Sequence, residues 1–400
     1  MIPMRLEFSA LHVCLGDEDT FERMQGLSVE EPFAPARMDF LNEVSRVLLS
    51  NREARQYSDI VTFAFWIRRA NMEELKRRFS RDGTIRLGRG VVFHITPSNV
   101  AVNYAYSLAS SFVLGNANIV RLPSKEFPQV TIINQAIRTV MGKRGFQDTL
   151  ALVRYERNCD INDYFSSICD VRVVWGGDAT IRELRKSPLP PRAGEITFAD
   201  RYSICVIDAT AYLKREDKER IALGFYNDTY LSDQNACTSP RMVCWIGNAV
   251  DTAQAQECFW KRLEEVVSSK YEFQPVQFVD KLTTTCLAAA EVEDLHVLPM
   301  KDNRITRVEL GGLDPVIQNY KGNSGFFFEY RLRDILELVP LCSVNMQTVA
   351  FLGDREVFRP LFKHGVKGID RITEIGHTMD FDLIWDGYDL VERLTRTICV

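Results

Sequence analysis

The sequence lacks the patterns of a metal site, a disulfide framework or a membrane span. Its ten cysteines include no CxxC pair, and none lies at zinc spacing from one of the five histidines. The longest apolar cluster, Val61 to Ile67, covers seven positions, far fewer than the ~18 residues of a membrane-spanning helix. Arg5 and Glu7 interrupt the apolar stretch near the N-terminus, so we expect no signal peptide. These absences predict reduced thiols, no bound metal and a cytoplasmic location.

Basic residues are fewer than acidic residues in this sequence. The 400 residues include 54 acidic and 49 basic side chains, which gives a net charge of −5. A general nucleic-acid-binding protein is expected to be more basic than this, so we predict no nucleic-acid partner. Hydrophobic residues make up 46% and charged residues 26%, a balance typical of globular proteins that excludes a mainly disordered chain. The length suggests two or three domains.

Residues 1 to about 85 are expected to be mostly helical. Apolar side chains recur near a 3.6-residue period from Phe40 to Leu49. In residues 59–79, glutamates precede a run of basic residues. This order is typical of a solvent-facing amphipathic helix, which we favour over a basic binding surface.

From residue 87 onward, short apolar runs alternate with helical patterns, and this alternation predicts an α/β fold with a largely parallel sheet. Glycines at 115 and 142 are expected to end two of the helices. A second α/β domain is expected from about residue 210 to 370. The predicted strands are Val91–Ile95, a run within 116–124, Val171–Trp175 and Tyr202–Ala209 in the first region, and Met242–Ile246, 306–312, 324–332 and 347–353 in the second.

Three segments at the ends of predicted strands carry polar or glycine residues suited to a ligand. Asn99 follows the first strand, where its amide either donates to a developing oxyanion or caps the next helix. Arg121 and Lys125 flank the end of the second strand, and they suit a phosphate unless they are ordinary solvated cations. Gly176 and Gly177 follow the third strand and offer backbone amides to a pyrophosphate, although they do not form a GxGxxG motif. The glycine pair has a steric alternative, since a tight strand-to-helix turn also favours it.

Cys237 is the candidate nucleophile among the ten cysteines. It lies among small and polar residues, whereas Cys244 and Cys258 have apolar neighbours. If the segment is helical, Arg241 shares a face with the thiol and favours the thiolate. The alternative is a small buried thiol, the usual role of cysteine in a reducing environment.

A cluster of acidic residues near the C-terminus has two interpretations. Four aspartates within residues 380–390 suit a hard metal ion, but their spacing matches no known metal-binding loop. We therefore favour a solvated turn with Trp385 and Tyr388 in the core. The four aspartates are Asp380, Asp382, Asp386 and Asp389.

Taken in order, these segments resemble the aldehyde dehydrogenase superfamily. They are more similar to the LuxC-type acyl-CoA reductases, typified by the fatty acid reductase of bacterial luciferase operons. The matching passages are GVVFHITPSNVAVNYAYSLASSFVLGNANIVRLPSK, VVWGGDATI, LSDQNACTSPR and MDFDLIWDGYDL, within residues 85–395. The resemblance implies a Rossmann-type cofactor domain and a second α/β catalytic domain. The domains expected are 1–209 (helical region and dinucleotide-binding domain), 210–372 (catalytic domain) and 373–400 (a tail returning to the first domain).

The resemblance also implies roles for individual residues. Cys237 corresponds to the acyl-accepting nucleophile, and Asn99 to the oxyanion-stabilising asparagine. Gly176 and Gly177 correspond to the turn near the dinucleotide phosphates. The segment containing Arg121, Ser124 and Lys125 corresponds to the family's K-P-S-E segment, which contacts the adenosine ribose.

Four positions depart from or only weakly match the superfamily pattern. Leu122 replaces the lysine of K-P-S-E and Lys125 its glutamate, which favours NADPH over NADH as the cofactor because an acid that would repel a phosphate is absent. Phe198 stands where hydrolytic aldehyde dehydrogenases carry a glutamate, so water activation against a thioester is not expected. Glu329 is a weak candidate for a contact with the nicotinamide ribose.

The reaction expected from this resemblance is NAD(P)H-dependent reduction of an acyl thioester to an aldehyde through an acyl group on Cys237. The acyl donor is either acyl-CoA or an acylated protein, and the family suggests a homo-oligomer and an acyl-transferring partner enzyme. His377 is either a proton-transfer group or, as we favour, a structural histidine. Two other functions stay open: acyl transfer or hydrolysis without redox chemistry, and an inactive acyl-binding subunit.

Overall fold

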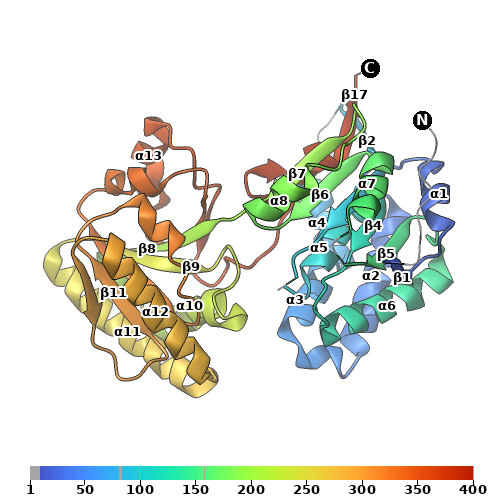
Figure 1. Ribbon diagram of the computed structural model, residues 1–400. Helices are drawn as coiled ribbons and strands as arrows, with labels where there is room; N and C mark the ends of the chain where they lie inside the picture. Colours follow the sequence, from blue (N-terminus) through green and yellow to red (C-terminus); the bar gives the residue numbers. More distant parts are fainter. Residues whose placement is uncertain (1–9, 81–82, 99, 157, 400) are drawn as a thin grey trace. The chain divides into compact units, whose positions relative to one another are not determined.

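The structure, a computed structural model, describes residues 10–80, 83–98, 100–156 and 158–399. Its contacts divide into two compact units (Figure 1). Unit 1 runs to Ala199 and takes in the chain from Asp382 onward, and unit 2 is Asp200–Phe381. Among the described residues, no helix has both the length and the apolar character needed to cross a lipid bilayer.

Unit 1 is built on a six-stranded sheet in the order β1-β5-β4-β3-β6-β7. All neighbours in it are parallel except β1, which pairs antiparallel with β5. The strands are β1 (His12–Leu15), β3 (Val91–Ile95), β4 (Ala117–Arg121), β5 (Leu150–Arg154), β6 (Val171–Trp175) and β7 (Gly194–Phe198). The helices are α1 (Thr20–Gln25), α2 (Pro35–Ser50), η2 (Ala54–Gln56), α3 (Ser58–Trp66), α4 (Arg69–Phe79), α5 (Asn103–Val113), α6 (Pro128–Arg144), α7 (Cys159–Ile168) and α8 (Asp178–Leu184).

The predicted strands and helices of this region are largely confirmed. β3 and β6 have the predicted bounds, and both are buried along their whole length, as expected of central parallel strands covered on two faces. The helix predicted around residues 40–49 is α2. One boundary differs: α6 continues past Gly142 and ends before Gly145, whose φ of +84° suits a C-terminal glycine.

A buried polar network fastens the centre of this sheet to α5. The Trp175 indole N–H donates to the Ser107 hydroxyl over 2.9 Å, and this hydroxyl lies 2.7 Å from His94 Nδ1. His94 Nε2 lies 3.0 Å from the Asn118 side-chain oxygen. Because Asn118 donates its own amide to the Asn116 carbonyl, Nε2 of His94 carries the proton and Nδ1 accepts from Ser107. Burial lowers the pKa of His94 to about 4, which keeps the ring neutral.

Unit 2 is built on a seven-stranded sheet in the order β10-β11-β12-β9-β8-β13-β14. Only β10 at the edge is antiparallel to its neighbour. The strands are β8 (Tyr202–Asp208), β9 (Pro240–Ile246), β10 (Leu295–Leu298), β11 (Thr306–Leu310), β12 (Phe326–Leu332), β13 (Met346–Leu352) and β14 (Arg371–Glu374). The helices are α9 (Ala209–Leu213), α10 (Lys218–Thr229), η3 (Tyr230–Ser232), α11 (Ala249–Lys270), α12 (Pro275–Glu291), η4 (Pro315–Asn319), η5 (Ile335–Leu341), η6 (Arg355–Phe358) and α13 (Arg359–His364).

The division between the units differs from the domain boundary expected from the sequence. β8, expected in the first domain, lies between β9 and β13 at the centre of the second sheet. After residue 382 the chain belongs to unit 1, where a short antiparallel strand pairs with β2 (Ile85–Gly88). The C-terminal elements are β15 (Ile384–Trp385), β16 (Tyr388–Asp389), α14 (Leu390–Leu394) and β17 (Thr395–Ile398).

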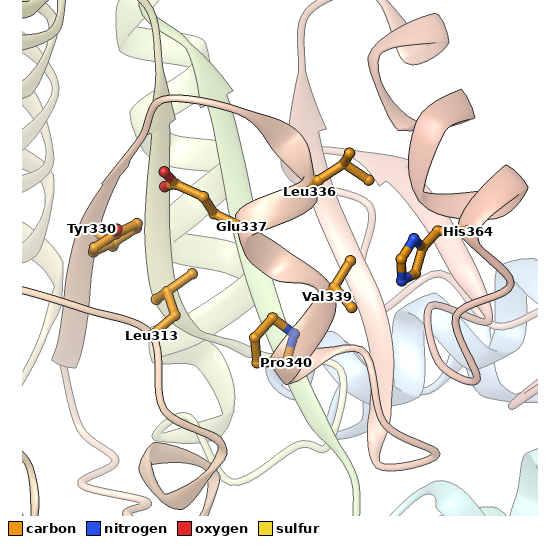
Figure 2. Close-up of a pocket in the computed structure, with 7 residues that line it drawn as sticks. All are labelled: Leu313, Tyr330, Leu336, Glu337, Val339, Pro340 and His364. Carbon is orange, nitrogen blue, oxygen red and sulfur yellow. The ribbon is translucent and has the colours of Figure 1, made fainter.

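An open pocket of about 450 Å³ lies in unit 2 beside β12, η5 and α13 (Figure 2). Its wall is mainly apolar, and Tyr330, Glu337 and His364 add polar groups at its margin. None of the predicted site residues that the structure describes lines this pocket. The other lining residues are Leu313, Leu336, Val339 and Pro340.

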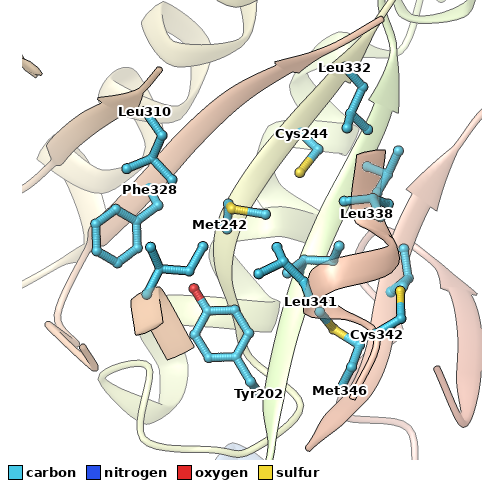
Figure 3. Packing of buried hydrophobic residues seen from close by; sticks show 14 of the residues in the cluster. Tyr202, Met242, Cys244, Leu310, Phe328, Leu332, Leu338, Leu341, Cys342 and Met346 are labelled. Carbon is cyan, nitrogen blue, oxygen red and sulfur yellow. The ribbon is translucent and has the colours of Figure 1, made fainter. Parts of the chain in front are cut away.

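The core of unit 2 forms on both faces of its sheet, and three consecutive phenylalanines of β12 contribute to both. Phe326 and Phe328 pack with Met242 on the face covered by η5 (Figure 3). Phe327 packs on the opposite face with Trp260 of α11. All three phenylalanines are fully buried, because side chains alternate between the faces of a strand that is covered on both sides. They are core residues of the described chain.

Prediction on the buried imidazole. The folded His94 has a pKa below the ordinary value of about 6.5, so the unfolded chain binds more protons between pH 6.5 and 4. The stability that the neutral ring provides is therefore lost as the pH falls through this window, by up to about 3 kcal/mol. Urea unfolding of the wild type and of His94→Gln, which does not titrate there, checks this. The wild type is expected to lose more stability than the variant on acidification, and parallel pH profiles would contradict the assignment.

Candidate active site

Cys237 lies in a turn between η3 and β9, which we call the cysteine loop (residues 233–239). The strand predicted at Met242–Ile246 is confirmed as β9, which begins two residues earlier at Pro240. Arg241 therefore lies in a strand, and the condition that it shares a helical face with the thiol is not met. The thiol is half-buried. Burial lowers the pKa of the Arg241 guanidinium, and the electrostatic effects of Tyr202 and Cys237 oppose that shift. A buried cation therefore lies close enough to the thiol for an electrostatic interaction, without a shared helical face.

Arg241 is almost fully buried and holds the loop as well as acting on the thiol. Its guanidinium donates to the Gln234 carbonyl over 2.7 Å and to the side-chain oxygen of Asn323. Asn323 in turn donates to the Asn235 side chain over 3.1 Å. Both ends of the cysteine loop are thus joined to the segment that precedes β12.

The Gln234 side chain is the main connection between the cysteine loop and the sheet. It is fully buried, and its amide nitrogen donates to the carbonyls of Pro240 and Phe326 over 2.8 and 2.9 Å. Its oxygen accepts from the backbone amides of Gly325 and Phe326 over 2.9 and 3.2 Å. Sequence reasoning missed this residue, since nothing in the composition distinguishes it from an exposed glutamine.

Five residues in and opposite the loop adopt the left-handed backbone conformation. Asp233 and Gln234 have φ of 49° and 59°, and Asn323, Ser324 and Gly325 have φ of 51°, 48° and 86°. The Ser324 amide donates to the Asp233 carbonyl over 3.0 Å and joins the two turns. Such conformations cost ~1–3 kcal/mol each outside glycine and persist where surrounding contacts enforce them. The thiol is therefore presented on a tightly determined turn.

The Cys237 carbonyl is also fixed. The Ser203 hydroxyl of β8 donates to it over 2.7 Å and accepts from the Thr348 amide of β13 over 3.2 Å. Cys237 thus lies where β8, β9 and β13 meet at one end of the sheet.

In unit 1, the predicted cofactor residues follow the strands β4 and β6. The order of the parallel strands reverses between β3 and β6, and the carboxyl ends of strands at such a point are where α/β sheets bind ligands. Arg121 is the last residue of β4, Ser124 and Lys125 follow it and are exposed, and Gly176 and Gly177 follow β6. The structure thus places these five residues along one edge of the sheet. Asn99 lies outside the described residues.

Arg121 and Gly176 already make contacts within unit 1. The Arg121 guanidinium lies 4.4 Å from the centre of the Tyr155 ring and donates to the Tyr155 carbonyl over 3.2 Å. The Gly176 amide donates to the Phe198 carbonyl over 3.1 Å, so it belongs to the sheet and is not part of an open nest of amides. A side chain at Gly176 would also crowd Thr180, since a Cβ atom would lie 3.3 Å from that side chain. Ser124 and Lys125 are exposed at this edge. The next residue, Glu126, is exposed as well, and its carboxylate lies 3.5 Å from the Arg154 guanidinium.

Phe198 ends β7 next to Trp175. The two rings stack at 3.6 Å between their centres with an angle of 17° between their planes, and Tyr388 contacts Phe198 edge-on at 5.8 Å. At position 198, where the resemblance places the glutamate of hydrolytic aldehyde dehydrogenases, this chain has a phenylalanine. Its ring packs in an aromatic cluster with Trp175 and Tyr388.

Glu329 is not placed to contact a ribose. Its carboxylate is 0% exposed in β12 and accepts from the indoles of Trp245 and Trp260 and from Gln256, all through one oxygen at 2.7–2.8 Å. The other oxygen accepts two hydrogen bonds from Arg307, at 2.6 and 2.9 Å. The residue holds α11 on the sheet, and sequence reasoning was wrong to consider it as a cofactor contact.

Three of the four C-terminal aspartates have separate partners, and the fourth, Asp386, is buried where a solvated position was expected. Asp380 lies 2.7 Å from His377, Asp382 pairs with Arg78 at 2.7 Å, and Asp389 accepts from the Glu392 amide at the start of α14. Among the described residues, no group of three or more His, Cys, Asp or Glu side chains is arranged to hold a metal ion.

The solved structures similar to this chain include several aldehyde dehydrogenases. Betaine aldehyde dehydrogenase from Staphylococcus aureus has a TM-score of 0.65 at 13% identity, covering 95% of this chain and 86% of that one. Aldehyde dehydrogenase 21 from Physcomitrella patens has a TM-score of 0.65 at 12% identity, covering 95% and 89%. The chain has the aldehyde dehydrogenase fold, as the sequence predicted.

The family model described as acyl-CoA reductase (LuxC) matches residues 58–292, more than half of the chain. The chain therefore belongs to this family. The long-chain acyl-protein thioester reductase of Aliivibrio fischeri is 22% identical over 297 residues, which cover 72% of this chain and 58% of that protein. A second such reductase, from Photobacterium leiognathi, is 24% identical over 168 residues, covering 41% and 34%. The matched regions thus cover 58% and 34% of the lengths of these two relatives, less than two thirds of either.

The first prediction for this site concerns Gln234, which holds the cysteine loop. Gln234→Leu removes all four hydrogen bonds of this fully buried side chain, and each unsatisfied partner costs ~1–3 kcal/mol. We expect the free energy of unfolding in urea to fall by about 3 kcal/mol or more. The matched control is Asn235→Ala at the exposed neighbouring position, which is expected to change the stability by less than about 1 kcal/mol. Equal losses in the two variants would contradict the role given to Gln234.

Proposed function

We propose that this chain reduces an acyl thioester to an aldehyde, with the acyl group carried on Cys237 and a reduced nicotinamide nucleotide as the hydride donor. The observation that carries the proposal is the presentation of Cys237. This half-buried thiol lies on a turn held by Gln234 and Ser203 and influenced by the buried Arg241 cation. A thiolate is the form of cysteine that attacks a carbonyl carbon.

In the first step proposed, the Cys237 sulfur attacks the thioester carbonyl and the thiolate of the donor leaves. The Cys237 backbone amide and the Asn99 side chain are the groups proposed to stabilise the oxyanion. Loss of one such donor typically costs ~10²–10³ in rate. The nicotinamide supplies the hydride that reduces the acyl carbon, and the aldehyde leaves as the Cys237 sulfur is released.

Two exposed residues at the edge of the unit 1 sheet, Ser124 and Lys125, suit a dinucleotide. Lys125 is exposed, 5.1 Å from the centre of the Phe127 ring, and Ser124 beside it adds a hydroxyl. We propose that this segment holds the adenosine end of the cofactor and that Gly176 and Gly177 leave room for the phosphates. The cation at Lys125 favours NADPH over NADH.

The stacked pair of Phe198 and Trp175 supports reduction over hydrolysis. A phenyl ring at position 198 offers no base to activate water, so an acyl group on Cys237 would persist until it is reduced. The acyl donor is proposed to be acyl-CoA, after the family, or an acylated protein, after the relatives named acyl-protein thioester reductases. An acyl-transferring partner enzyme and a homo-oligomer are proposed on the same family basis.

Prediction on the nucleophile. Incubation with labelled acyl-CoA, from acetyl to palmitoyl, is expected to acylate the wild-type chain, and NADPH is expected to discharge the label as aldehyde. Cys237→Ala is expected to form no acyl-enzyme and to oxidise no NADPH. Cys258→Ala, another half-buried thiol of unit 2, serves as the control and should retain both signals.

If the Cys237→Ala variant still becomes acylated by the labelled acyl-CoA, Cys237 is not the nucleophile. Acylation of the wild type without NADPH oxidation would instead support acyl transfer without redox chemistry. If the wild type shows neither acylation nor NADPH oxidation, the result would support an inactive acyl-binding subunit.

Prediction on cofactor preference. Lys125→Glu exchanges a cation for an anion beside the proposed 2′-phosphate position. A hydrogen bond to a charged group contributes ~1.5–3 kcal/mol, so we expect the KM for NADPH to rise ~10-fold or more with a smaller effect on NADH. The control is Lys143→Glu, an exposed lysine of α6 in the same unit, which should leave both KM values near those of the wild type. An equal change in the two KM values for Lys125→Glu would refute the preference.

A further inference from the structure

The segment that follows β14 is built around His377. The backbone amides on either side of it, those of Gly376 and Thr378, both donate to the buried Asp228 carboxylate of α10, over 2.6 and 3.0 Å. The carbonyls of His377 and Thr378 accept from the Arg371 guanidinium over 2.8 and 3.1 Å. Two charged side chains thus fix four backbone groups around a single histidine.

Close packing against α10 adds to this constraint. The backbones of Gly376 and Gly224 approach so closely that a Cβ atom on Gly376 would lie 3.0 Å from the Gly224 Cα. Gly376 also has a φ of +97°, which other residues rarely adopt. Burial raises the pKa of Asp228 to about 6, while its contacts with the two amides favour the charged form. The backbone on both sides of His377 is thus fixed by close packing as well as by charge.

The His377 ring is oriented as well as its backbone. Nδ1 lies 2.7 Å from the Asp380 carboxylate, and the side chain is 52% exposed. Among the described residues, the structure records a partner for Nδ1 and none for Nε2. A carboxylate that holds one ring nitrogen sets the tautomer and aims the other nitrogen, the arrangement found where histidine serves a nucleophile.

This segment contacts the cysteine loop within unit 2. The Thr238 hydroxyl, on the residue after Cys237, lies 3.2 Å from the Met379 sulfur, two residues after His377. Thr238 is buried, so the contact is part of the packing and not a surface encounter. The turn that presents the thiol and the turn that presents the imidazole are therefore in direct contact.

We propose that His377, oriented by Asp380, is the proton acceptor for the Cys237 thiol. The S–H bond of Cys237 breaks and an N–H bond forms at Nε2. The sulfur then bonds to the acyl carbon, the bond from that carbon to the donor sulfur breaks, and the proton passes from Nε2 to the departing thiolate. Asp228 and Arg371 are positioning residues for this step. The inference deepens the proposed function and rests on it for the identity of the acyl group.

The experiment measures thiol activation without an acyl donor or a cofactor. The full-length chain is treated with iodoacetamide at neutral pH, and alkylation of the Cys237 peptide is followed by mass spectrometry. We expect His377→Gln to slow alkylation of Cys237 by ~10-fold or more, since a general base typically contributes 10²–10⁴. Added imidazole is expected to restore part of the rate in His377→Ala and to leave the wild type unchanged, a response that loss of structure alone would not give.

Matched controls separate the proton role from folding. His296→Gln alters another exposed histidine of unit 2 that pairs with a nearby aspartate, Asp294, at 2.9 Å, and it should alkylate like the wild type. Asp380→Asn keeps the ring and loses the carboxylate, so we expect an intermediate rate. It also provides the test if His377→Gln does not fold.

An unchanged Cys237 alkylation rate in folded His377→Gln would overturn the inference, as would a wild-type rate in Asp380→Asn. Failure of the proposed function would look different, because the wild type would then show fast, His377-dependent alkylation but form no aldehyde from any acyl thioester.

Discussion

The cysteine loop is held by side chains and not by a helix or a strand ladder, and the rest of the candidate site depends on this constraint. A turn with left-handed residues at Asp233 and Gln234 has no regular hydrogen-bond pattern of its own. The buried Gln234 amide supplies what the backbone lacks by bonding four groups at the start of β9 and β12. Because burying an amide is favourable only when its hydrogen bonds are made, the loop and the two strands stabilise one another as a unit.

Buried side-chain hydrogen bonds also connect the elements of unit 1, where an uncharged network holds the centre of the sheet. His94, Ser107 and Trp175 connect β3, α5 and β6 by two hydrogen bonds. Trp175 then stacks on Phe198 of β7. Next to the carboxyl edge that is proposed to hold a dinucleotide, the buried polar groups are hydrogen-bonded and the aromatic rings are stacked. A rigid edge of this kind suits a ligand whose reacting atom must be held to a fraction of an ångström.

Much of the fold could be predicted from the sequence because its signals are local. The buried runs Val91–Ile95 and Val171–Trp175 are bounded by glycine or proline, and both are strands with the predicted ends. The run Met242–Ile246 was also predicted as a strand, but its start was not. β9 begins at Pro240, where it pairs with Ser203 of β8, and this partner is remote in sequence.

The candidate site was predictable only in part. Cys237 could be singled out because its neighbours are small and polar. Gln234, Asp228 and Ser203 could not, because their importance comes from partners up to about 150 residues away in the chain. Glu329 shows the opposite failure, since only the family resemblance made it a candidate for a contact with the nicotinamide ribose. The tryptophans that enclose it lie on residues 245 and 260, and only the fold brings them to it.

The stacked rings of Phe198 and Trp175 also limit how this molecule can diverge. A carboxylate introduced at position 198 would be buried against an indole whose N–H is already engaged by Ser107, with a desolvation cost of several kcal/mol. A single substitution at position 198 would therefore place an acid in a closely stacked aromatic contact, and the surrounding side chains would have to change with it.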